Sequence, residues 1–169
     1  VDVFRGVPFG RSLRGEPLVC QLRGKNTVVG GMPDQGKSSV ARVVMVGSAL
    51  DHTAELRIWV PDHNFDFDAF QPRCSRYVMG AEDETVEQIV LDLEELAAEI
   101  QTRGRKLLEY GEPEVTRALA SKGVGMHPIV ALLEEAHLVF GHPDFGERAA
   151  KAAVDVVRLG RKRFIHLIT

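Results

Sequence analysis

The order of apolar and polar residues along the chain predicts three helices. From Ala81 to Tyr110, apolar side chains recur at steps of three and four, which places them on one face of a long amphipathic helix. Gly111 and Pro113 interrupt this pattern and end the helix. The same spacing predicts shorter helices at Lys37–Leu50 and Glu147–Leu159.

Short apolar runs between these helices are typical of strands. "LRIWV" at Leu56–Val60 is closed by a proline, "HPIVALL" at His127–Leu133 is almost continuously apolar, and Asn26–Val29 and Phe164–Ile168 are shorter. A continuous apolar run is expected where both faces of a parallel strand are buried. Strands that alternate with helices therefore predict an α/β fold, with a mostly parallel sheet and helices on both faces.

The first 25 residues follow a different pattern. The segment "FRGVPFGRSLRGEP", rich in glycine, proline and arginine, predicts short extended pieces paired as an edge hairpin. The 169 residues contain no repeat or long linker and have the length of one ordinary domain. We expect a single domain over 1–169, with 1–25 as lead-in edge strands and 26–169 as the core. Because the chain starts at Val1 and "IHLIT" reads as an interior strand, we expect a fragment truncated at its C-terminal end.

Composition narrows the classes of function. Apolar residues make up 44% of the chain and charged residues 27%, and the formal net charge is -3. This balance is typical of soluble globular proteins and gives no overall attraction to nucleic acid, so any polyanion site must be local. No apolar run approaches the roughly 20 residues that span a membrane. Cys20 and Cys74 lie far apart in sequence and are expected to be reduced thiols in a cytoplasmic protein.

One stretch carries a phosphate-binding pattern. "GMPDQGKS", Gly31–Ser38, fits G-x-x-x-x-G-K-[ST] and lies between a predicted strand and a predicted helix, as the mechanism of a phosphate loop requires. Backbone N–H groups of such a loop point inward, and the helix adds its positive end. Lys37 would reach the β and γ phosphates of ATP, and the Ser38 hydroxyl would bind Mg²⁺. The predicted nucleotide-binding residues are Gly31, Met32, Pro33, Asp34, Gln35, Gly36, Lys37, Ser38 and Ser39.

Two residues of this loop are unusual for their position. Pro33 has no N–H to donate, and Asp34 would repel phosphate if its side chain pointed inward. We expect both on the outer rim, where they leave the inner donors free.

Two adjacent acids follow the apolar run that ends at Leu133. In an ATP-hydrolysing site one acid supports Mg²⁺ and a second orients the attacking water. We predict that Glu134 takes the metal role, through water, and that Glu135 is the catalytic acid. His137 either senses the γ-phosphate or packs within the fold, and packing is the favoured interpretation.

The densest basic run is "RLGRKR", residues 158–163. It is consistent with solvated charges at the end of a helix, with an arginine finger that reaches a neighbouring subunit, or with a contact to a DNA backbone. The residues alone leave these alternatives open.

Four blocks together resemble the FtsK/SpoIIIE group of the HerA–FtsK motor ATPases, over roughly residues 26–169. The blocks are "NTVVGGMPDQGKSS", "LDLEELAAEIQTRGRKLLE", "HPIVALLEEAHLVF" and "VVRLGRKRFIHLIT". The resemblance implies a RecA-like P-loop core and a hexameric ring that hydrolyses ATP between subunits. It also implies double-stranded DNA as the usual cargo, and membrane attachment through segments outside the motor. Arg161 is the first choice for the trans-acting catalytic arginine, with Arg103 and Arg158 as alternatives.

The chain departs from the family pattern at two places. Pro61-Asp62-His63-Asn64 stands where many members have Asp-Pro-Lys, so only Asp62 matches, and Glu134 replaces the usual aspartate. The leading hypothesis is the ATPase core of a DNA translocase of the cell-division, chromosome-segregation or conjugative plasmid-transfer type. The alternatives are an ATPase that drives protein export in a specialised secretion system, and a nucleotide-dependent switch with little turnover.

Overall fold

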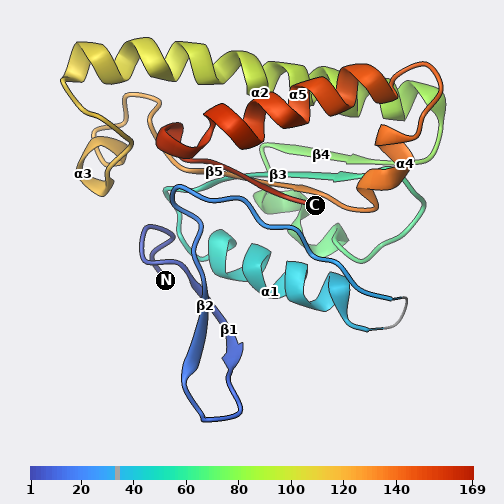
Figure 1. Cartoon of the computed structure of the whole chain (residues 1–169), viewed down its shortest axis with the longest axis horizontal. Coiled ribbons are helices and arrows are strands. Elements are labelled where there is room, and N and C mark those ends of the chain that lie inside the picture. The colour runs from blue at the N-terminus through green and yellow to red at the C-terminus, as the bar shows by residue number, and fades with distance from the viewer. Residues whose placement is uncertain (33–34) are drawn as a thin grey trace.

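A parallel sheet of four strands forms the centre of the structure, a computed structural model that describes residues 1–32 and 35–169. The strand order is β4-β3-β5-β6, and helices cover both faces, as the sequence predicts (Figure 1). The strands and helices are β1 Val7–Arg11, β2 Pro17–Cys20, α1 Lys37–Ala49, β3 Glu55–Val60, β4 Arg76–Met79, α2 Asp83–Tyr110, α3 Arg117–Ala120, β5 Ile129–Leu133, α4 Ala136–Phe140, α5 Gly146–Leu159 and β6 Ile165–Ile168, with 3-10 turns at Asp68–Arg73 and Arg161–Arg163.

Strand β5 is buried on both faces, which explains its continuous apolar sequence. Ile129, Ala131 and Leu133 belong to the core beneath α2 and α5, whereas Val130 and Leu132 belong to the core on the α1 side. Successive side chains of a strand point to opposite faces, so both faces must be apolar. The prediction of a doubly covered parallel strand is therefore confirmed.

The long helix α2 lies across one face of the sheet beside α5 (Figure 1). It begins at Asp83, two residues later than the sequence predicts, and Gly111 caps its end in the left-handed conformation with φ 67°. The apolar residues of its buried face are Val86, Ile89, Val90, Leu93, Leu96, Ile100 and Leu107. Their steps of three and four are the stripe on which the prediction rested.

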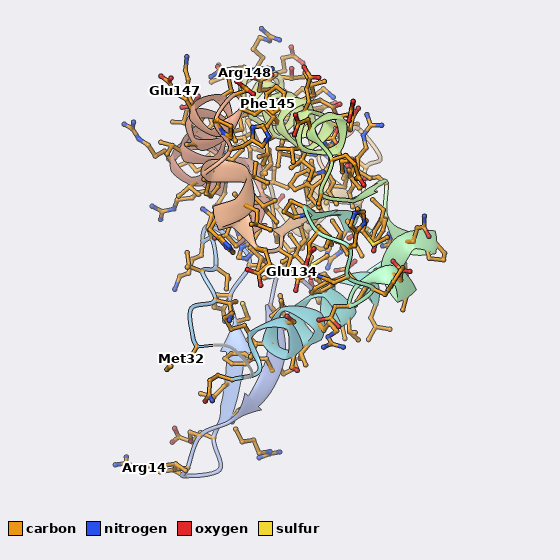
Figure 2. All side chains as sticks on the ribbon, turned by 90° about the vertical axis from the view of Figure 1, so that its right-hand side faces the viewer. Arg14, Met32, Glu134, Phe145, Glu147 and Arg148 are labelled. Carbon is orange, nitrogen blue, oxygen red and sulfur yellow. The ribbon has the colours of Figure 1, made fainter. Side chains whose placement is uncertain are left out.

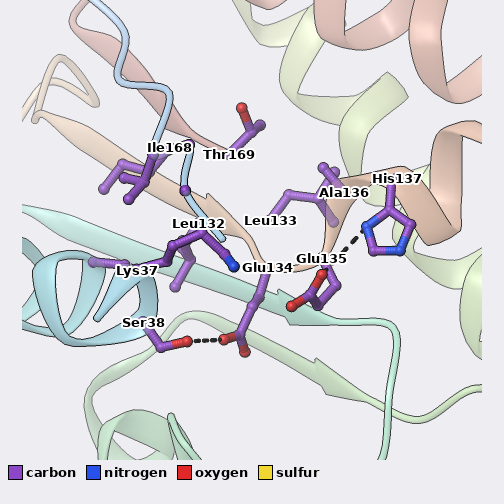
Figure 3. A pocket seen from close by; sticks show the side chains of 14 residues that line it. Lys37, Ser38, Leu132, Leu133, Glu134, Glu135, Ala136, His137, Ile168 and Thr169 are labelled. Atoms are coloured by element: carbon purple, nitrogen blue, oxygen red, sulfur yellow. Dashed lines mark hydrogen bonds and ion pairs between the residues drawn. The ribbon is translucent and has the colours of Figure 1, made fainter. Parts of the chain in front are cut away.

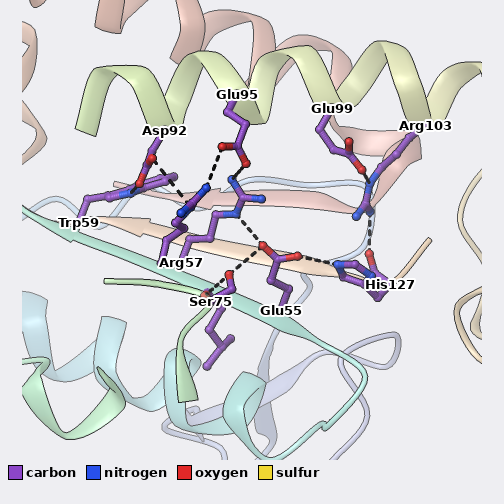
Figure 4. Close-up of polar contacts among 11 residues, drawn as sticks. Glu55, Arg57, Trp59, Ser75, Asp92, Glu95, Glu99, Arg103 and His127 are labelled. Carbon is purple, nitrogen blue, oxygen red and sulfur yellow. Dashed lines mark hydrogen bonds and ion pairs between the residues drawn. The ribbon is translucent and has the colours of Figure 1, made fainter. Parts of the chain in front are cut away.

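Acids of α2 bind the sheet through polar contacts (Figure 4). The Trp59 indole N–H donates to Asp92 over 3.0 Å, and Arg57 and Arg76 each donate to Glu95 over 3.1 Å. Arg57 is buried, so its charge requires these partners. The contacts fix α2 along the sheet in addition to its apolar stripe.

The opening segment forms a hairpin of β1 and β2, which are antiparallel and make a two-stranded sheet of their own rather than edge strands of the central sheet. The hairpin extends away from the sheet, with Arg14 near its tip (Figure 2). Its base packs on α1 at Gly47, where any Cβ would overlap the Val7 side chain. Glycine at this helical position therefore permits the close approach of the hairpin.

The predicted strand at Asn26–Val29 is reduced to one bridge, between Thr27 and Ile168. Thr27 N–H donates to Leu167, Thr169 N–H to Thr27, and Val29 N–H to Thr169, over 2.8 to 3.1 Å. The prediction of a regular strand is wrong here, since the pairing forms a single bridge whose hydrogen bonds reach Thr169, the last residue of the chain. The segment still runs beside β6, which separates it from β5.

His166 on β6 anchors the segment that leads into this pairing. Its Nδ1 lies 3.0 Å from the Leu22 carbonyl oxygen and 2.7 Å from that of Lys25, and its Nε2 lies 3.0 Å from Thr27 Oγ1. These partners suit a neutral ring with the proton on Nδ1. Burial lowers the pKa of His166 to about 4 from 6.5, and the two backbone contacts oppose this shift only in part.

We therefore predict a pH-dependent stability. The unfolded chain takes up a proton on this histidine near pH 6.5, and folded His166 does so only near pH 4, so the free energy of unfolding falls as the pH decreases through this window. The total loss is about 3 kcal/mol, from the 1.36 kcal/mol that each pKa unit represents. Urea unfolding of wild type and His166→Gln between pH 4 and 7 measures it, and the variant should show a flatter profile.

The exposed His52 supplies the control. His52→Gln should keep the wild-type pH dependence. An equal slope in wild type and His166→Gln would contradict the assignment.

Candidate functional site

The glycine loop enters α1 through Gly36. Gly36 caps α1 with φ 82°, a left-handed conformation that favours glycine, and Lys37 and Ser38 form the first helical positions. Lys37 Nζ donates to the Met32 carbonyl oxygen over 3.3 Å, so the ammonium group lies across the loop. The Met32 side chain, in a residue 75% exposed, points away from the body of the domain (Figure 2).

Pro33 and Asp34 lie outside the described residues, so their expected place on the rim stays a prediction. Of the other predicted loop residues, Gly31, Gln35 and Ser39 are exposed at the loop and at the start of α1.

Ser38 and Glu134 meet across the site. The Ser38 hydroxyl donates to Glu134 Oε1 over 2.9 Å, although the two residues are 96 positions apart in the chain (Figure 3). Burial raises the pKa of Glu134 above its ordinary value, and the hydrogen bonds from Ser38 and Asn64 act against that rise. The two residues predicted to support Mg²⁺ are thus in direct contact.

Glu135 adopts a strained backbone conformation next to this pair. Its φ is 44°, a value in the left-handed region that is uncommon for a residue other than glycine. Its carboxylate lies 3.2 Å from His137 Nδ1, and the Glu135 side chain is 40% exposed (Figure 3). The His137 side chain is 72% exposed, so the expectation that it packs within the fold is wrong. Strain of this kind is often concentrated at functional sites.

A cavity of about 350 Å³ opens between the glycine loop and the ends of β5 and β6. Its lining residues are Val29, Gly30, Gly31, Lys37, Ser38, Ala41, Leu132, Leu133, Glu134, Glu135, Ala136, His137, Ile168 and Thr169 (Figure 3). A second, more open cavity of about 550 Å³ adjoins the start of α1 and is lined by Ser39, Arg42, Asp66 and Glu135, among others. Glu135 therefore lines both cavities.

Asn64 is a site residue that the sequence analysis missed. Its amide Nδ2 donates to Glu134 Oε2 over 3.3 Å. Asp62, the residue that matches the family pattern, instead accepts a hydrogen bond from the neighbouring His63 N–H. Its position in the chain could have identified it. Asn64 follows β3, the parallel neighbour of β5, and parallel strands end at a common edge of the sheet.

The three candidate arginines lie in different environments. The Arg103 side chain is 1% exposed and donates to Glu99 and to the carbonyl oxygens of His127 and Arg163, so the alternative that it reaches another subunit is wrong (Figure 4). Arg158 and Arg161 are exposed. Arg161 Nε donates to the Gly24 carbonyl oxygen over 2.7 Å, close to the start of β6. The glycine loop lies at the other end of that strand.

The oxygen donors fit magnesium. Mg²⁺ prefers hydroxyl, carboxylate, water and phosphate oxygens, and Ser38 and Glu134 place two such protein oxygens side by side. Within 1–32 and 35–169, no group of three or more His, Cys, Asp or Glu side chains is arranged to hold a metal ion. A magnesium ion here would therefore need phosphate oxygens and water to complete its shell.

Several solved structures share the fold of this chain. Similar chains are Thermomonospora curvata EccC (ATPases 2 and 3) in complex with a signal sequence peptide, the pCW3 conjugation coupling protein TcpA with ATPgS, and EssC (ATPases 2 and 3) from Geobacillus thermodenitrificans. For Thermomonospora curvata EccC the TM-score is 0.74 at 17% identity, over 90% of this chain and 29% of that chain. For TcpA the TM-score is 0.73 at 15% identity, over 96% of this chain and 46% of that chain. For EssC the TM-score is 0.71 at 16% identity, over 97% of this chain and 32% of that chain.

These likenesses establish the RecA-like P-loop fold. The chain spans less than half of the length of each of these three proteins. No family model matches the chain, and no curated protein matches it. Among the described helices, none combines the length and the apolar character needed to cross a membrane.

Proposed function

We propose that this chain is the ATP-binding and ATP-hydrolysing core of an FtsK/SpoIIIE-like translocase, and part of a longer protein. The observation that carries the proposal is the convergence of Lys37, Ser38, Glu134 and Glu135 on one cavity at the carboxyl edge of a parallel sheet. A phosphate loop and two acids at this edge are the parts that hydrolysis of ATP requires. The fold shared with EccC, EssC and TcpA supports the same conclusion.

Each side chain has a role in this mechanism. Lys37 exchanges its hydrogen bond to Met32 for the β and γ phosphates of ATP. Ser38 and Glu134 would hold Mg²⁺, Glu134 through water, and the ion would supply positive charge beside the phosphate oxygens. Glu135 orients the attacking water and polarises it toward the γ-phosphate.

The catalytic arginine is proposed to come from a neighbouring subunit. Arg161 is exposed and lies at the opposite end of β6 from the glycine loop, so it is free to face the site of another copy. A trans arginine stabilises the charge that develops during phosphoryl transfer. We propose a hexameric ring for the full-length protein, which brings the two surfaces together.

Double-stranded DNA is the proposed cargo, as in chromosome segregation or conjugative plasmid transfer. The likeness to TcpA, a conjugation coupling protein, supports it. A polypeptide is the second candidate, because the similar EccC structure is a complex with a signal sequence peptide. The proposed site is compatible with either cargo, since hydrolysis uses the same residues in both.

We predict that Lys37→Ala lowers the affinity for ATP at least tenfold. The loss of the ammonium group removes the charged contact to the β and γ phosphates, and charge-assisted hydrogen bonds of this kind contribute roughly 1.5–3 kcal/mol. Titration with a fluorescent ATP analogue measures the affinity. Lys25→Ala removes an exposed lysine of the lead-in and should bind as wild type does. Equal affinity in Lys37→Ala and wild type would refute the assigned site.

Glu135→Gln separates a motor from a switch. The amide cannot polarise water, so we expect ATP binding to persist while turnover falls roughly 10²- to 10⁴-fold, the range for loss of a general base. Phosphate release by the full-length protein measures turnover. A nucleotide-dependent switch with little turnover would instead keep its biological activity in Glu135→Gln.

The cargo is tested with the full-length protein. Linear duplex DNA should stimulate its ATP hydrolysis, and the stimulation should fall as salt increases, because phosphate contacts release counterions. Stimulation of ATP hydrolysis by a polypeptide from a secreted protein is measured for comparison. Stimulation by the polypeptide and none by DNA would overturn the DNA proposal in favour of protein export.

A further inference from the structure

The Asn64 side chain connects two parts of the site through a single amide. Its Oδ1 accepts from the Asp66 backbone N–H over 3.2 Å, and its Nδ2 donates to Glu134 Oε2 over 3.3 Å. An amide has its acceptor on one side and its donors on the other. The turn at Asp66 therefore fixes the oxygen, and the amide nitrogen is left facing the carboxylate.

Both oxygens of the Glu134 carboxylate are engaged, by residues of different elements. Oε1 accepts from Ser38 at the start of α1, and Oε2 accepts from Asn64 after β3. Ser38 is the residue proposed to bind Mg²⁺, so Oε1 faces the metal side of the site. Oε2 is held by the Asn64 amide, so Oε1 is the oxygen that faces the ion.

This restraint matters because position 134 is a glutamate. Glutamate has one more rotatable bond than aspartate, and an unrestrained side chain samples several rotamers. The hydrogen bond from Asn64 favours one orientation of the Glu134 carboxylate.

The loop that carries Asn64 is anchored independently of the amide. Asp66 lies 3.7 Å from the Arg42 guanidinium of α1, and His63 Nε2 lies 3.1 Å from Glu82 at the start of α2. Removal of the amide group should therefore leave the loop attached to both helices.

We propose that Asn64 is a positioning residue for magnesium: it holds Glu134 in the orientation in which Oε1 supports the ion beside Ser38. The inference rests on the proposed function and assigns a role to a residue that does not match the family pattern. Partners of this kind, which orient a metal ligand without touching the metal, typically change metal affinity 10- to 100-fold when they are removed.

Asn64→Ser tests the proposal. The serine hydroxyl can still accept from the Asp66 N–H, as in an ST turn, but it is too short to reach Glu134. We expect the Mg²⁺ concentration for half-maximal binding of a fluorescent ATP analogue to rise about tenfold. Binding of the same analogue in EDTA should stay within about twofold of wild type, because the phosphate loop is intact. If Asn64 had only a structural role, Asn64→Ser would weaken binding of the analogue both with Mg²⁺ and in EDTA.

His63→Ala is the matched control, since it alters the same loop without touching Glu134. Its Mg²⁺ dependence should equal that of wild type. Thermal unfolding checks that each variant is folded, and Asn64→Ala, expected to give the same rise, replaces Asn64→Ser if the latter does not fold. A wild-type Mg²⁺ dependence in a folded Asn64 variant, while Lys37→Ala still loses ATP, would overturn this inference alone. No nucleotide binding by wild type would overturn the proposed function and the inference together.

Discussion

Three backbone hydrogen bonds between residues 27–29 and the end of β6 determine where the glycine loop begins. They join Thr27 to Leu167 and Thr169, and Val29 to Thr169. Because β6 pairs in parallel with β5, the same bonds set the distance from the loop to Glu134 at the end of β5. The contact between Ser38 and Glu134, across 96 positions of sequence, depends on this register. His166 supports it from within the sheet by holding the preceding segment.

The sequence predicts well those elements in which the spacing of apolar residues shows which faces are buried. The apolar stripe of helix α2 predicts that one face is buried, and the continuous apolar run of strand β5 predicts that both faces are buried. Strand β4, "RYVM", was not predicted because it is only four residues long and partly exposed at the edge of the sheet. The segment at Asn26–Val29 has the composition of a strand, but whether it forms a regular ladder depends on pairing with β6, which no local pattern encodes.

The same distinction separates the site residues. Lys37, Ser38, Glu134 and Glu135 were predicted from motifs whose spacing carries chemistry. Their convergence follows from the parallel order of the strands. The contact of Asn64 with Glu134 depends on the neighbouring order of β3 and β5 and on a turn at Asp66, so it exists only in the folded chain. Arg103 fits the family pattern but faces inward, because its position on α2 points toward the sheet.

The position of Arg161 relative to the acids constrains the proposed mechanism. Arg161 precedes β6, and the glycine loop adjoins the far end of that strand, a separation on the order of 13 Å for four residues of strand. Its guanidinium is held near the start of β6 by the Gly24 carbonyl oxygen. An arginine so placed faces away from the cavity of its own chain. If Arg161 contributes to hydrolysis, it must therefore do so in a second copy, and assembly becomes a condition for catalysis rather than a separate property of the protein.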